Sequence, residues 1–547
     1  MGELPSGRLA VRALRRAGVE QLFTLPGGDL FPLYDGCRHE GVRIVDTRHE
    51  QAAAFAAEAM AKLTRRPQVA ALSAGPGVIN ALSAIATAAS GGSPLTVLAG
   101  RAPPATVGSG NLQEPDHQAV VAALVKHAAT ASEPAAVAPA VAGALRAAGT
   151  PHRGPALVDI PADVMVARAD EVTVAGPPPP EPVEVDLDAV AAAAAELRRA
   201  ERPLLVAGTD VWLGGAYAAL RDLVDAAGLP VVLQGMGRGC LPADHDLVVS
   251  RARGLALSRA DLVTVVGMPL DSRVGFDRCA DARVMHVADH PGLLAGHVEL
   301  AAGVAGDLAA ALTALAEAVG EATEQRRAWS EQLRDAEAAA RAADAALLES
   351  DAAPIHPARV CGELRRLLDR DAVVIGDGDD LMSFVGCYVD TYTPGCWLDP
   401  GPFGCLGTGM GYAAAARLAH PHRQVVAVLG EGAAARGMMD AATLVRHRLP
   451  VLVVVGNNGI WPDREPGRQR DDDGDGAADR QPGLRYDEVV TALGGAGETV
   501  QRPSDLAPAF ERGLAAGVPY LVNVLIDPTV SYTDPRPPAA AARPPSP

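Results

Sequence analysis

Short apolar runs alternate with longer Ala-rich stretches along most of this chain. The short runs predict buried strands, and the Ala-rich stretches predict helices because Ala is a strong helix former. Strands that alternate with helices favour parallel sheets covered on both faces. The runs that predict strands most clearly are Val69–Ala74, Pro94–Gly100, Pro203–Gly208, Asp261–Gly267, Asp371–Gly378, Gln424–Leu429, Pro450–Val455 and Tyr520–Asp527.

Two segments divide this pattern into three parts. Gly176–Pro180 contains four consecutive prolines, which predict a stiff extended linker. Thr323–Glu349 predicts a long helix just before a second boundary. We therefore expect an α/β fold of three doubly wound parallel-sheet domains, at residues 1–175, 186–345 and 353–533, each of ordinary size. The Pro/Ala-rich end, 534–547, and the charged segment 468–483 predict disorder.

Composition narrows the class of protein. The net charge of −18 disfavours nucleic acid and anionic membranes as partners. The chain contains no apolar run of the roughly 20 residues that a membrane span needs, and its first residues do not resemble a signal peptide, so we expect a cytoplasmic protein. The seven cysteines include no CxxC pair, which predicts reduced thiols rather than a disulfide framework or a zinc site.

Oxygen-bearing side chains follow two strands that are close together in the sequence. Gly430-Glu431-Gly432 follows the first, and Gly456-Asn457-Asn458 follows the second. The carboxyl ends of parallel strands lie at one edge of a sheet, where ligands bind. Carboxylate and carboxamide oxygens suit a hard cation that holds a phosphate.

The stretch from Gly430 to Asn458 resembles the metal–diphosphate motif of thiamine diphosphate enzymes, with 27 positions between Glu431 and Asn458. Three earlier stretches, 23–35, 46–64 and 73–101, resemble the pyrimidine-binding domain of that family in the same order. Residues 394–432 resemble the acetolactate synthase-like branch. The resemblance extends from about Leu9 to Asp527 and includes a central domain.

The resemblance implies two catalytic side chains. Glu50 would hydrogen-bond the aminopyrimidine of the cofactor and so assist loss of the proton on the thiazolium carbon. Gln113, in the stretch Asn111–His117, would face the reacting centre. Ordinary alternatives stay open, because acids are also favoured in the first turn of a helix and a loop Gln is often a surface residue.

The resemblance also implies residues that hold the cofactor and its Mg²⁺. Leu406 would wedge the cofactor into a bent shape, and the backbone of Gly404 would receive its amino group. Gly28 would lie over the aminopyrimidine. The other implied cofactor-binding residues are Asp377, Asp379, Asp380, Gly430, Gly432 and Ala433, and the implied metal ligands are Glu431, Asn458 and the carbonyl of Ile460.

Several residues at the diphosphate end depart from the family pattern. Glu431 stands where the family has Asp, and its extra methylene matters because Mg²⁺ needs ligands at about 2.0–2.1 Å. Asp379 adds an acid beside Asp377 and Asp380, which would crowd an anionic diphosphate. The remaining departures are Ala434, Arg436 and Pro462.

These residues predict Mg²⁺-dependent decarboxylation of a pyruvate-like 2-oxo acid, followed by ligation to a second carbonyl. Alternatives are a 2-oxo acid decarboxylase, a 2-hydroxyacyl-CoA lyase relative, and an eroded paralogue or subunit partner without activity. The lyase would need a basic pocket, and the sequence shows no Arg/Lys cluster. The resemblance implies a homodimer or tetramer with active sites between subunits, and FAD in the central domain is possible but not favoured.

Overall fold

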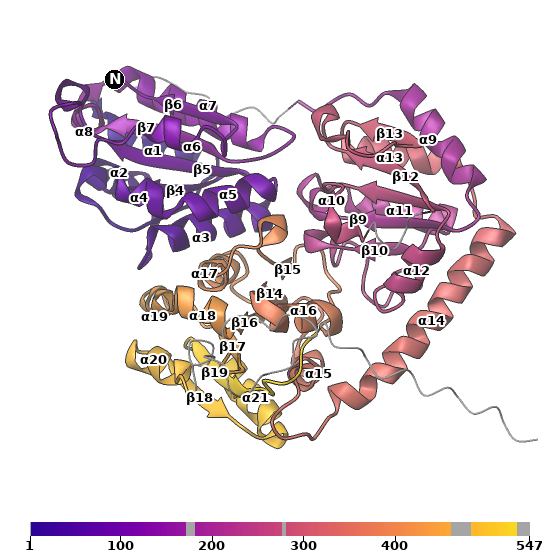
Figure 1. Cartoon of the computed structure of the whole chain (residues 1–547). Coiled ribbons are helices and arrows are strands. Elements are labelled where there is room, and N and C mark those ends of the chain that lie inside the picture. Colours follow the sequence, from indigo (N-terminus) through magenta and orange to yellow (C-terminus); the bar gives the residue numbers. More distant parts are fainter. Residues whose placement is uncertain (1, 171–180, 276–280, 461–482, 533–547) are drawn as a thin grey trace, which may run out of the picture.

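The computed structural model describes residues 2–170, 181–275, 281–460 and 483–532. Three parallel sheets covered by helices confirm the predicted fold class (Figure 1). The Gly176–Pro180 linker, the 534–547 tail and nearly all of segment 468–483 lie outside the described residues. The domain boundaries given above stay predictions.

The N-terminal sheet has the strand order β3-β2-β4-β5-β7-β6, and all of its neighbours are parallel. Helix α3 begins at Glu50, after a short turn that follows strand β3. The elements are β1 Leu4–Pro5, α1 Ser6–Arg16, β2 Gln21–Thr24, α2 Phe31–Glu40, β3 Arg43–Asp46, α3 Glu50–Thr64, β4 Gln68–Leu72, α4 Pro76–Asn80, α5 Leu82–Ser90, β5 Leu95–Arg101, α6 His117–Val121, β6 His127–Thr130, α7 Val137–Gly149, β7 Ala156–Pro161, α8 Ala162–Val166 and β8 Arg168–Ala169.

The central sheet has the order β10-β9-β11-β12-β13 and is also parallel. It is followed by α14, the long helix that the sequence predicts before the second boundary. The elements are α9 Leu187–Arg199, β9 Pro203–Ala207, α10 Thr209–Leu213, α11 Tyr217–Ala227, β10 Val231–Leu233, α12 Arg253–Arg259, β11 Leu262–Val266, β12 Arg283–Ala288, β13 Ala302–Ala305, α13 Leu308–Val319 and α14 Glu324–Leu348.

The C-terminal sheet has the order β15-β14-β16-β17-β19-β18 and is parallel. Gly430 pairs with Gly456, so the two motif-bearing strands are neighbours. The elements are α15 Pro357–Leu367, β14 Val373–Asp377, α16 Asp379–Tyr388, β15 Trp397–Leu398, α17 Gly409–Ala419, β16 Val425–Gly430, α18 Glu431–Gly437, α19 Ala441–Arg446, β17 Leu452–Asn457, α20 Tyr486–Ala492, β18 Ala496–Val500, α21 Leu506–Ala515 and β19 Tyr520–Leu525.

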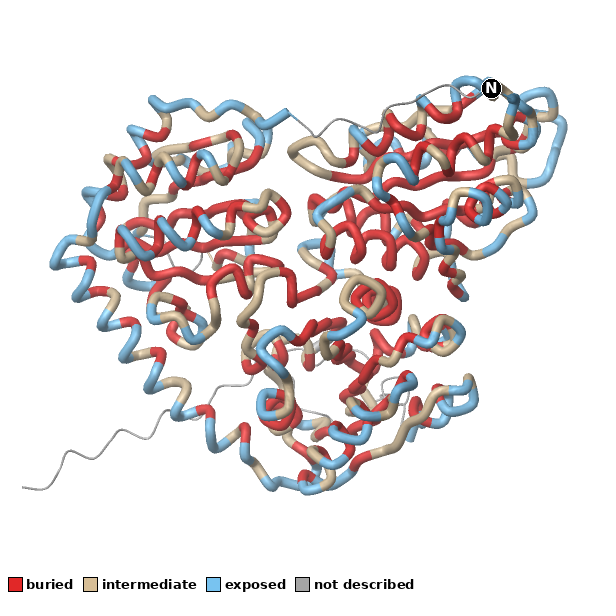
Figure 2. The backbone as a smooth tube through the Cα atoms, turned by 180° about the vertical axis from the view of Figure 1, so that it is seen from behind, coloured by how far each residue is buried: buried red, intermediate tan, exposed pale blue. Residues whose placement is uncertain are grey.

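Helices α3 and α17 join the N-terminal and C-terminal domains (Figure 1), and much of the backbone where these domains meet is buried (Figure 2). Small residues let them approach closely: an added Cβ at Gly411 would lie 2.9 Å from the carbonyl oxygen of Ala52. Most residues of both helices are buried, and one apolar core runs through both domains. The N-terminal and C-terminal sheets are therefore packed as one body.

A buried polar network fixes the register of this junction. Lys62 Nζ lies 2.7 Å from Glu58 Oε1, and the hydroxyl of Tyr412 donates to Glu58 Oε2 at 2.5 Å. Ser93 Oγ also donates to Glu58, at 3.0 Å. Because all of these groups are buried, sliding one helix along the other would leave a charge without its partner.

Helix α14 runs from the central domain to the C-terminal domain (Figure 1). Near its start, Trp329 donates its indole N–H to the carbonyl of Pro203 at 3.0 Å, and near its end Asp344 pairs with Arg251 at 2.8 Å. Among the helices that the structure describes, none is long and apolar enough to cross a membrane. The six cysteines that the structure describes form no disulfide bond.

Candidate functional site

The carboxyl ends of β16 and β17 bring the predicted metal ligands to one place. Glu431 is the first residue of α18 and is buried. Its Oε2 accepts a hydrogen bond from the backbone N–H of Gly459 at 2.8 Å. Asn458 and Ile460 flank Gly459, and Asn458 Oδ1 accepts from the N–H of Ile460 at 3.2 Å. The structure therefore places Glu431 against the loop that carries the other two predicted ligands.

The loop after β17 is held from the sheet side. Asn457 Nδ2 donates to Asn523 Oδ1 at 3.2 Å and to the carbonyl of Leu484 at 3.1 Å, while Asn457 Oδ1 accepts from Gly459 at 3.2 Å. The longer Glu431 side chain reaches this anchored loop through a charge-assisted hydrogen bond, the stronger kind. The loop thus accommodates the added methylene that the sequence marked as a departure.

Three chain segments meet at Gly378. Its φ of +75° places it in the left-handed region, and an added Cβ would lie 2.4 Å from Ala433 Cβ and 3.0 Å from Leu406 Cδ2. Only glycine fits there, so the loop after β14, helix α18 and Leu406 lie in contact. Gly404 also has a positive φ, and an added Cβ would meet no described atom within 4 Å. The backbone of Gly404 is therefore accessible, and its predicted contact with the aminopyrimidine stays a prediction.

Two of the three neighbouring acids are bound by backbone amides. The buried Asp377 carboxylate accepts from the N–H of Gly407 at 3.2 Å and of Gly409 at 2.7 Å. Asp380 accepts from the N–H of Tyr532 at 2.8 Å. The side chain of Asp379 lies outside the described part of the structure. The amides offset charge that the sequence alone left facing a diphosphate, and a cofactor-binding role for these acids stays a prediction.

Glu50 lies at the carboxyl edge of the N-terminal sheet. Its Oε2 accepts a hydrogen bond from Asn80 Nδ2 at 3.1 Å, and its Cγ lies 3.8 Å from the position of an added Cβ on Gly77. Asn80 ends α4, a helix that the sequence did not single out. Nothing in the local pattern marks Asn80, because it meets Glu50 only in the folded domain.

Gln113 lies near the start of α4, whereas Glu50 contacts Asn80 at the end of that helix. Gln113 has a φ of +62° and packs against Gly75, where an added Cβ would lie 3.1 Å from Gln113 Cβ. Gly75 precedes α4 and donates its N–H to His117 Nε2 at 2.9 Å. The two predicted catalytic residues therefore flank one short helix. Gly28 is exposed on a neighbouring turn, which Asp29 ties to the N–H of Ala74 at 2.9 Å.

Contacts with the C-terminal domain position the start of α3. Asp46 Oδ1 lies 2.9 Å from His447 Nε2, and the N–H of Arg48 donates to Asp440 at 2.7 Å. Burial alone would raise the pKa of Asp46, but its contacts with His447 and Arg48 hold that pKa below its usual value. Glu50 thus follows a turn that contacts with the C-terminal domain hold in place.

Three domain families match the chain in the same order as its sheets. Residues 6–120 match the N-terminal TPP binding domain of thiamine pyrophosphate enzymes, residues 190–315 match their central domain, and residues 380–524 match their C-terminal TPP binding domain. The chain belongs to the thiamine pyrophosphate enzyme family. This name denotes the same cofactor as thiamine diphosphate, and the predicted family is confirmed.

Individual relatives extend the match over nearly the whole chain. This thiamine pyrophosphate enzyme is 48% identical over 531 residues to the acetolactate synthase large subunit IlvG of Mycobacterium tuberculosis, with 96% of both chains covered. It is 30% identical to 2-hydroxyacyl-CoA lyase 2 of Caenorhabditis elegans, over 90% of this chain and 84% of that protein. It is 28% identical to oxalyl-CoA decarboxylase of Escherichia coli, over 95% and 94%.

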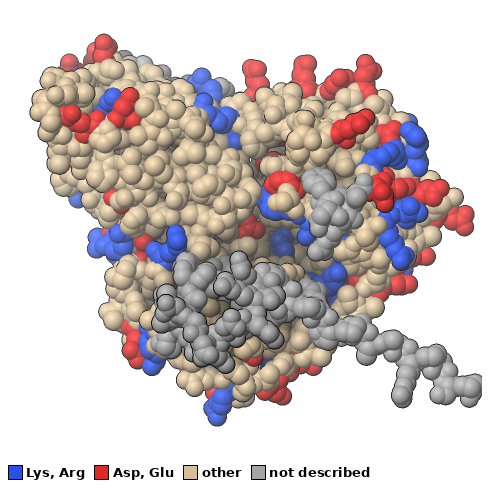
Figure 3. Space-filling model, viewed as in Figure 1, with Lys and Arg blue, Asp and Glu red and all other residues tan. Residues whose placement is uncertain are grey.

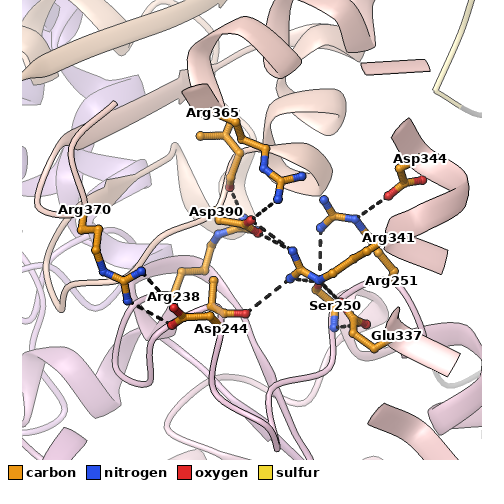
Figure 4. Close-up of polar contacts among 12 residues, drawn as sticks. Arg238, Asp244, Ser250, Arg251, Glu337, Arg341, Asp344, Arg365, Arg370 and Asp390 are labelled. Atoms are coloured by element: carbon orange, nitrogen blue, oxygen red, sulfur yellow. Dashed lines mark hydrogen bonds and ion pairs between the residues drawn. The ribbon is translucent and has the colours of Figure 1, made fainter. Parts of the chain in front are cut away.

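A cleft with a volume of about 760 Å³ lies between the central and C-terminal domains of this family member. In Figure 3 basic side chains stand in the hollow between these domains. The sequence shows no local Arg/Lys cluster, but the fold gathers arginines from separate elements. Those shown in Figure 4 are Arg238, Arg251, Arg341, Arg365 and Arg370.

Most of these arginines are already engaged. Arg341 pairs with Glu337 at 2.8 Å and, together with Arg365, with Asp390 at 3.1 Å (Figure 4). Arg238 stacks over Trp397, 4.1 Å from the ring centre, and donates to the carbonyl of Gly386 at 2.7 Å. The cluster therefore acts chiefly as a clamp between two domains rather than as an unpaired basic pocket.

A second ionic cluster joins the N-terminal and central domains. His152 Nδ1 lies 3.1 Å from Asp289 Oδ1 and 3.9 Å from Asp210 Oδ2. Burial alone would lower the pKa of His152, but Asp289 and Asp210 hold it above its usual value. Burial raises the pKa of Asp210 to about 7. Both acids lie just after strands of the central sheet, at the edge where nucleotides bind in doubly wound folds.

Proposed function

We propose that this chain is a thiamine diphosphate- and Mg²⁺-dependent enzyme that decarboxylates a pyruvate-like 2-oxo acid and joins the product to a second carbonyl compound. The observation that carries the proposal is the contact between Glu431 and the loop of Asn458 and Ile460. It joins two strand ends into one oxygen-lined site. The 48% identity to an acetolactate synthase large subunit supports this choice of reaction.

The residues present fit the cofactor. Glu431, Asn458 and the carbonyl of Ile460 would hold Mg²⁺, the backbone near Gly378 would approach the diphosphate, and the backbone of Gly404 would receive the amino group of the aminopyrimidine. Bound thiamine diphosphate supplies a carbon nucleophile for attack on the carbonyl of a 2-oxo acid. Glu50 would hold a proton at its carboxylate, oriented by Asn80, and Gln113 would donate its amide to the substrate.

A second copy of the chain would complete the site. Large apolar side chains are exposed beside the predicted site residues: Leu112 is 79% exposed next to Gln113, and Phe31 is 66% exposed close to Gly28. Phe403, next to Gly404, is 48% exposed. Such a surface suits burial against another subunit. It supports a homodimer or tetramer in which the pyrimidine and diphosphate ends come from different subunits.

We propose no flavin in the central domain. The space beside Asp210 and His152, at the ends of the central strands, has a volume of only about 20 Å³. Two buried carboxylates there, Asp210 and Asp289, would oppose the phosphates of a dinucleotide. A purified protein with a flavin absorption spectrum would contradict this part of the proposal.

A binding and product assay tests the function. The purified chain should bind thiamine diphosphate in the presence of Mg²⁺ by calorimetry, and pyruvate with a panel of carbonyl acceptors should yield a ligated product. Glu50→Gln should lower kcat by about 10²–10⁴-fold with little change in cofactor affinity, the size of a lost acid–base group. Glu20→Gln, an exposed acid in the same domain, serves as the control.

The outcomes separate the alternatives. Absence of cofactor binding would overturn the proposal and support an eroded paralogue. Release of free aldehyde without ligation would indicate a simple decarboxylase. Cleavage of a 2-hydroxyacyl-CoA in place of pyruvate would indicate the activity that the name of the nematode relative states.

A further inference from the structure

His117 lies behind the site and has no role in the function proposed above. It is the first residue of α6 and is completely buried. Its Nε2 accepts the N–H of Gly75 at 2.9 Å. An imidazole nitrogen that accepts is unprotonated, so the ring proton of the neutral form lies on Nδ1. The bond thus specifies one tautomer.

The other side of the ring faces an ion pair. His117 Nδ1 lies 3.6 Å from Asp159 Oδ2, too far for a hydrogen bond but close enough for electrostatic attraction. Arg101 donates to the same oxygen at 2.7 Å. Burial alone would raise the pKa of Asp159, but its contacts with His117, Thr130 and Arg101 hold that pKa below its usual value. A buried anion therefore favours the Nδ1–H tautomer.

Gly75 transmits this arrangement to both predicted catalytic residues. Its φ of +66° disfavours any other residue, and an added Cβ would lie only 3.1 Å from Gln113 Cβ. Gly75 also directly precedes α4, whose last residue, Asn80, donates to Glu50. A shift of the Gly75 backbone would displace the surface on which Gln113 packs. Through α4 it would also displace Asn80, which donates to Glu50.

We propose that His117 is a positioning residue, which holds the Gly75–Asn80 segment so that Gln113 and Glu50 keep their reactive geometry. This inference rests on the proposed function. Arg101 and Asp159 orient the ring from the sheet, and His117 itself touches neither substrate nor cofactor. Misplacement of reacting groups by about 1 Å can cost about a hundredfold in rate, so a distant anchor of this kind has a measurable effect.

Side-chain length distinguishes positioning from simple core filling. In His117→Gln, Oε1 lies where imidazole Nε2 lies and can accept the Gly75 N–H. In His117→Asn, Oδ1 lies where Nδ1 lies and cannot reach it. His117→Phe keeps the ring volume without an acceptor. His286→Phe is the matched control, because His286 is also buried and accepts a backbone N–H, from Ala295 at 3.1 Å, in the central domain.

Two measurements test the inference. Hydrogen–deuterium exchange with mass spectrometry, on protein without cofactor, should show faster exchange of peptides covering 73–80 in the Phe and Asn variants and wild-type exchange in the Gln variant. The rate of proton exchange at the thiazolium carbon of bound cofactor, followed by NMR after acid quench, should fall about tenfold or more in Phe and Asn and recover in Gln. His286→Phe should change neither.

Wild-type rates in His117→Phe, or equal losses in Gln and Phe, would overturn the inference. If the Phe variant fails to fold, the comparison between Asn and Gln decides in the same way. A wild type that binds the cofactor without proton exchange would overturn the proposed function and the catalytic half of this inference. The peptide exchange would still decide whether His117 holds the segment.

Discussion

Glu431 departs from the family pattern but still contacts the loop that carries the other predicted metal ligands. Glu431 reaches the N–H of Gly459, and Asn457 holds that loop from the other side. The sequence predicted which residues meet, because two parallel strands end together. The sequence could not predict that the loop accommodates the longer Glu431 side chain, because this depends on the distance of the loop from the end of the sheet.

Glu431→Asp should therefore weaken cofactor binding rather than improve it. The shorter side chain would lose the bond to Gly459, and a hydrogen bond to a charged group is worth about 1.5–3 kcal/mol, or about 10-fold to 150-fold in affinity. Calorimetric titration with thiamine diphosphate and Mg²⁺ measures the change. Glu498→Asp is the control. Glu498 lies on β18 and pairs with Arg512 of α21, so this change should leave the cofactor affinity unaltered. Tighter binding by Glu431→Asp would show that the loop is not adapted to Glu.

At the scale of elements, the junction of α3 and α17 depends on small residues around a buried ionic network. The chain has only two lysines, Lys62 and Lys126, and Lys62 lies at the centre of this junction. Removing one partner of a buried ion pair leaves the other charge uncompensated. The junction should thus be more sensitive to a lost charge than to lost volume.

Lys62→Met should destabilise the protein by about 3–5 kcal/mol, because Glu58 would remain buried without its cation. Tyr412→Phe, which keeps the ion pair, should cost about 1 kcal/mol. Lys126→Met is the control, because Lys126 donates to two backbone carbonyls near the end of α7. Thermal unfolding compares the three variants, and equal midpoints for Lys62→Met and Lys126→Met would contradict the prediction.

Elements were more predictable than their partners. Helices α3 and α14 and the main strands follow from apolar periodicity and Ala content, which are local. The contact of Asn80 with Glu50, the support from His117 and the arginines around Asp390 depend on residues far apart in sequence. No local pattern contains such distances, so the sequence reading missed all three.

At the scale of the whole molecule, ionic clusters join the central domain to both neighbours. The clamp around Asp390 and the cluster of His152, Asp210 and Asp289 differ in their ratio of acidic to basic groups. Asp390 has two arginine partners, whereas Asp210 and Asp289 share one histidine as their nearest cation in the cluster. The second junction should therefore depend on pH.

The sign follows from proton uptake. Asp210 has a folded-state pKa of about 7 against an ordinary value of 3.8, so the folded state binds this proton more tightly than the unfolded state. Stability from this group therefore falls as pH rises from about 4 to about 7 and is level above. The raised pKa of His152 acts in the same direction: its contribution is complete below about pH 6.5 and is lost as pH rises through the folded-state pKa.

Asp210→Asn should remove the loss of stability that deprotonation of Asp210 causes as pH rises. The melting temperature of the variant, relative to that of the wild type, should rise between about pH 5 and about pH 8. Asp188→Asn, an exposed acid on α9, should show no such trend. A constant difference between Asp210→Asn and wild type across that range would contradict the assigned proton uptake.

Helix α14 sets the distance and the angle between two domains at once. Trp329 fastens its beginning to the central sheet, and Arg341 and Asp344 fasten its later turns around the cleft. Each inserted residue would lengthen the helix by about 1.5 Å and swing everything beyond it by about 100°. The distance between the two domains can therefore change without a large rotation only by whole helical turns. The length of α14 thus determines the width of the arginine-lined cleft.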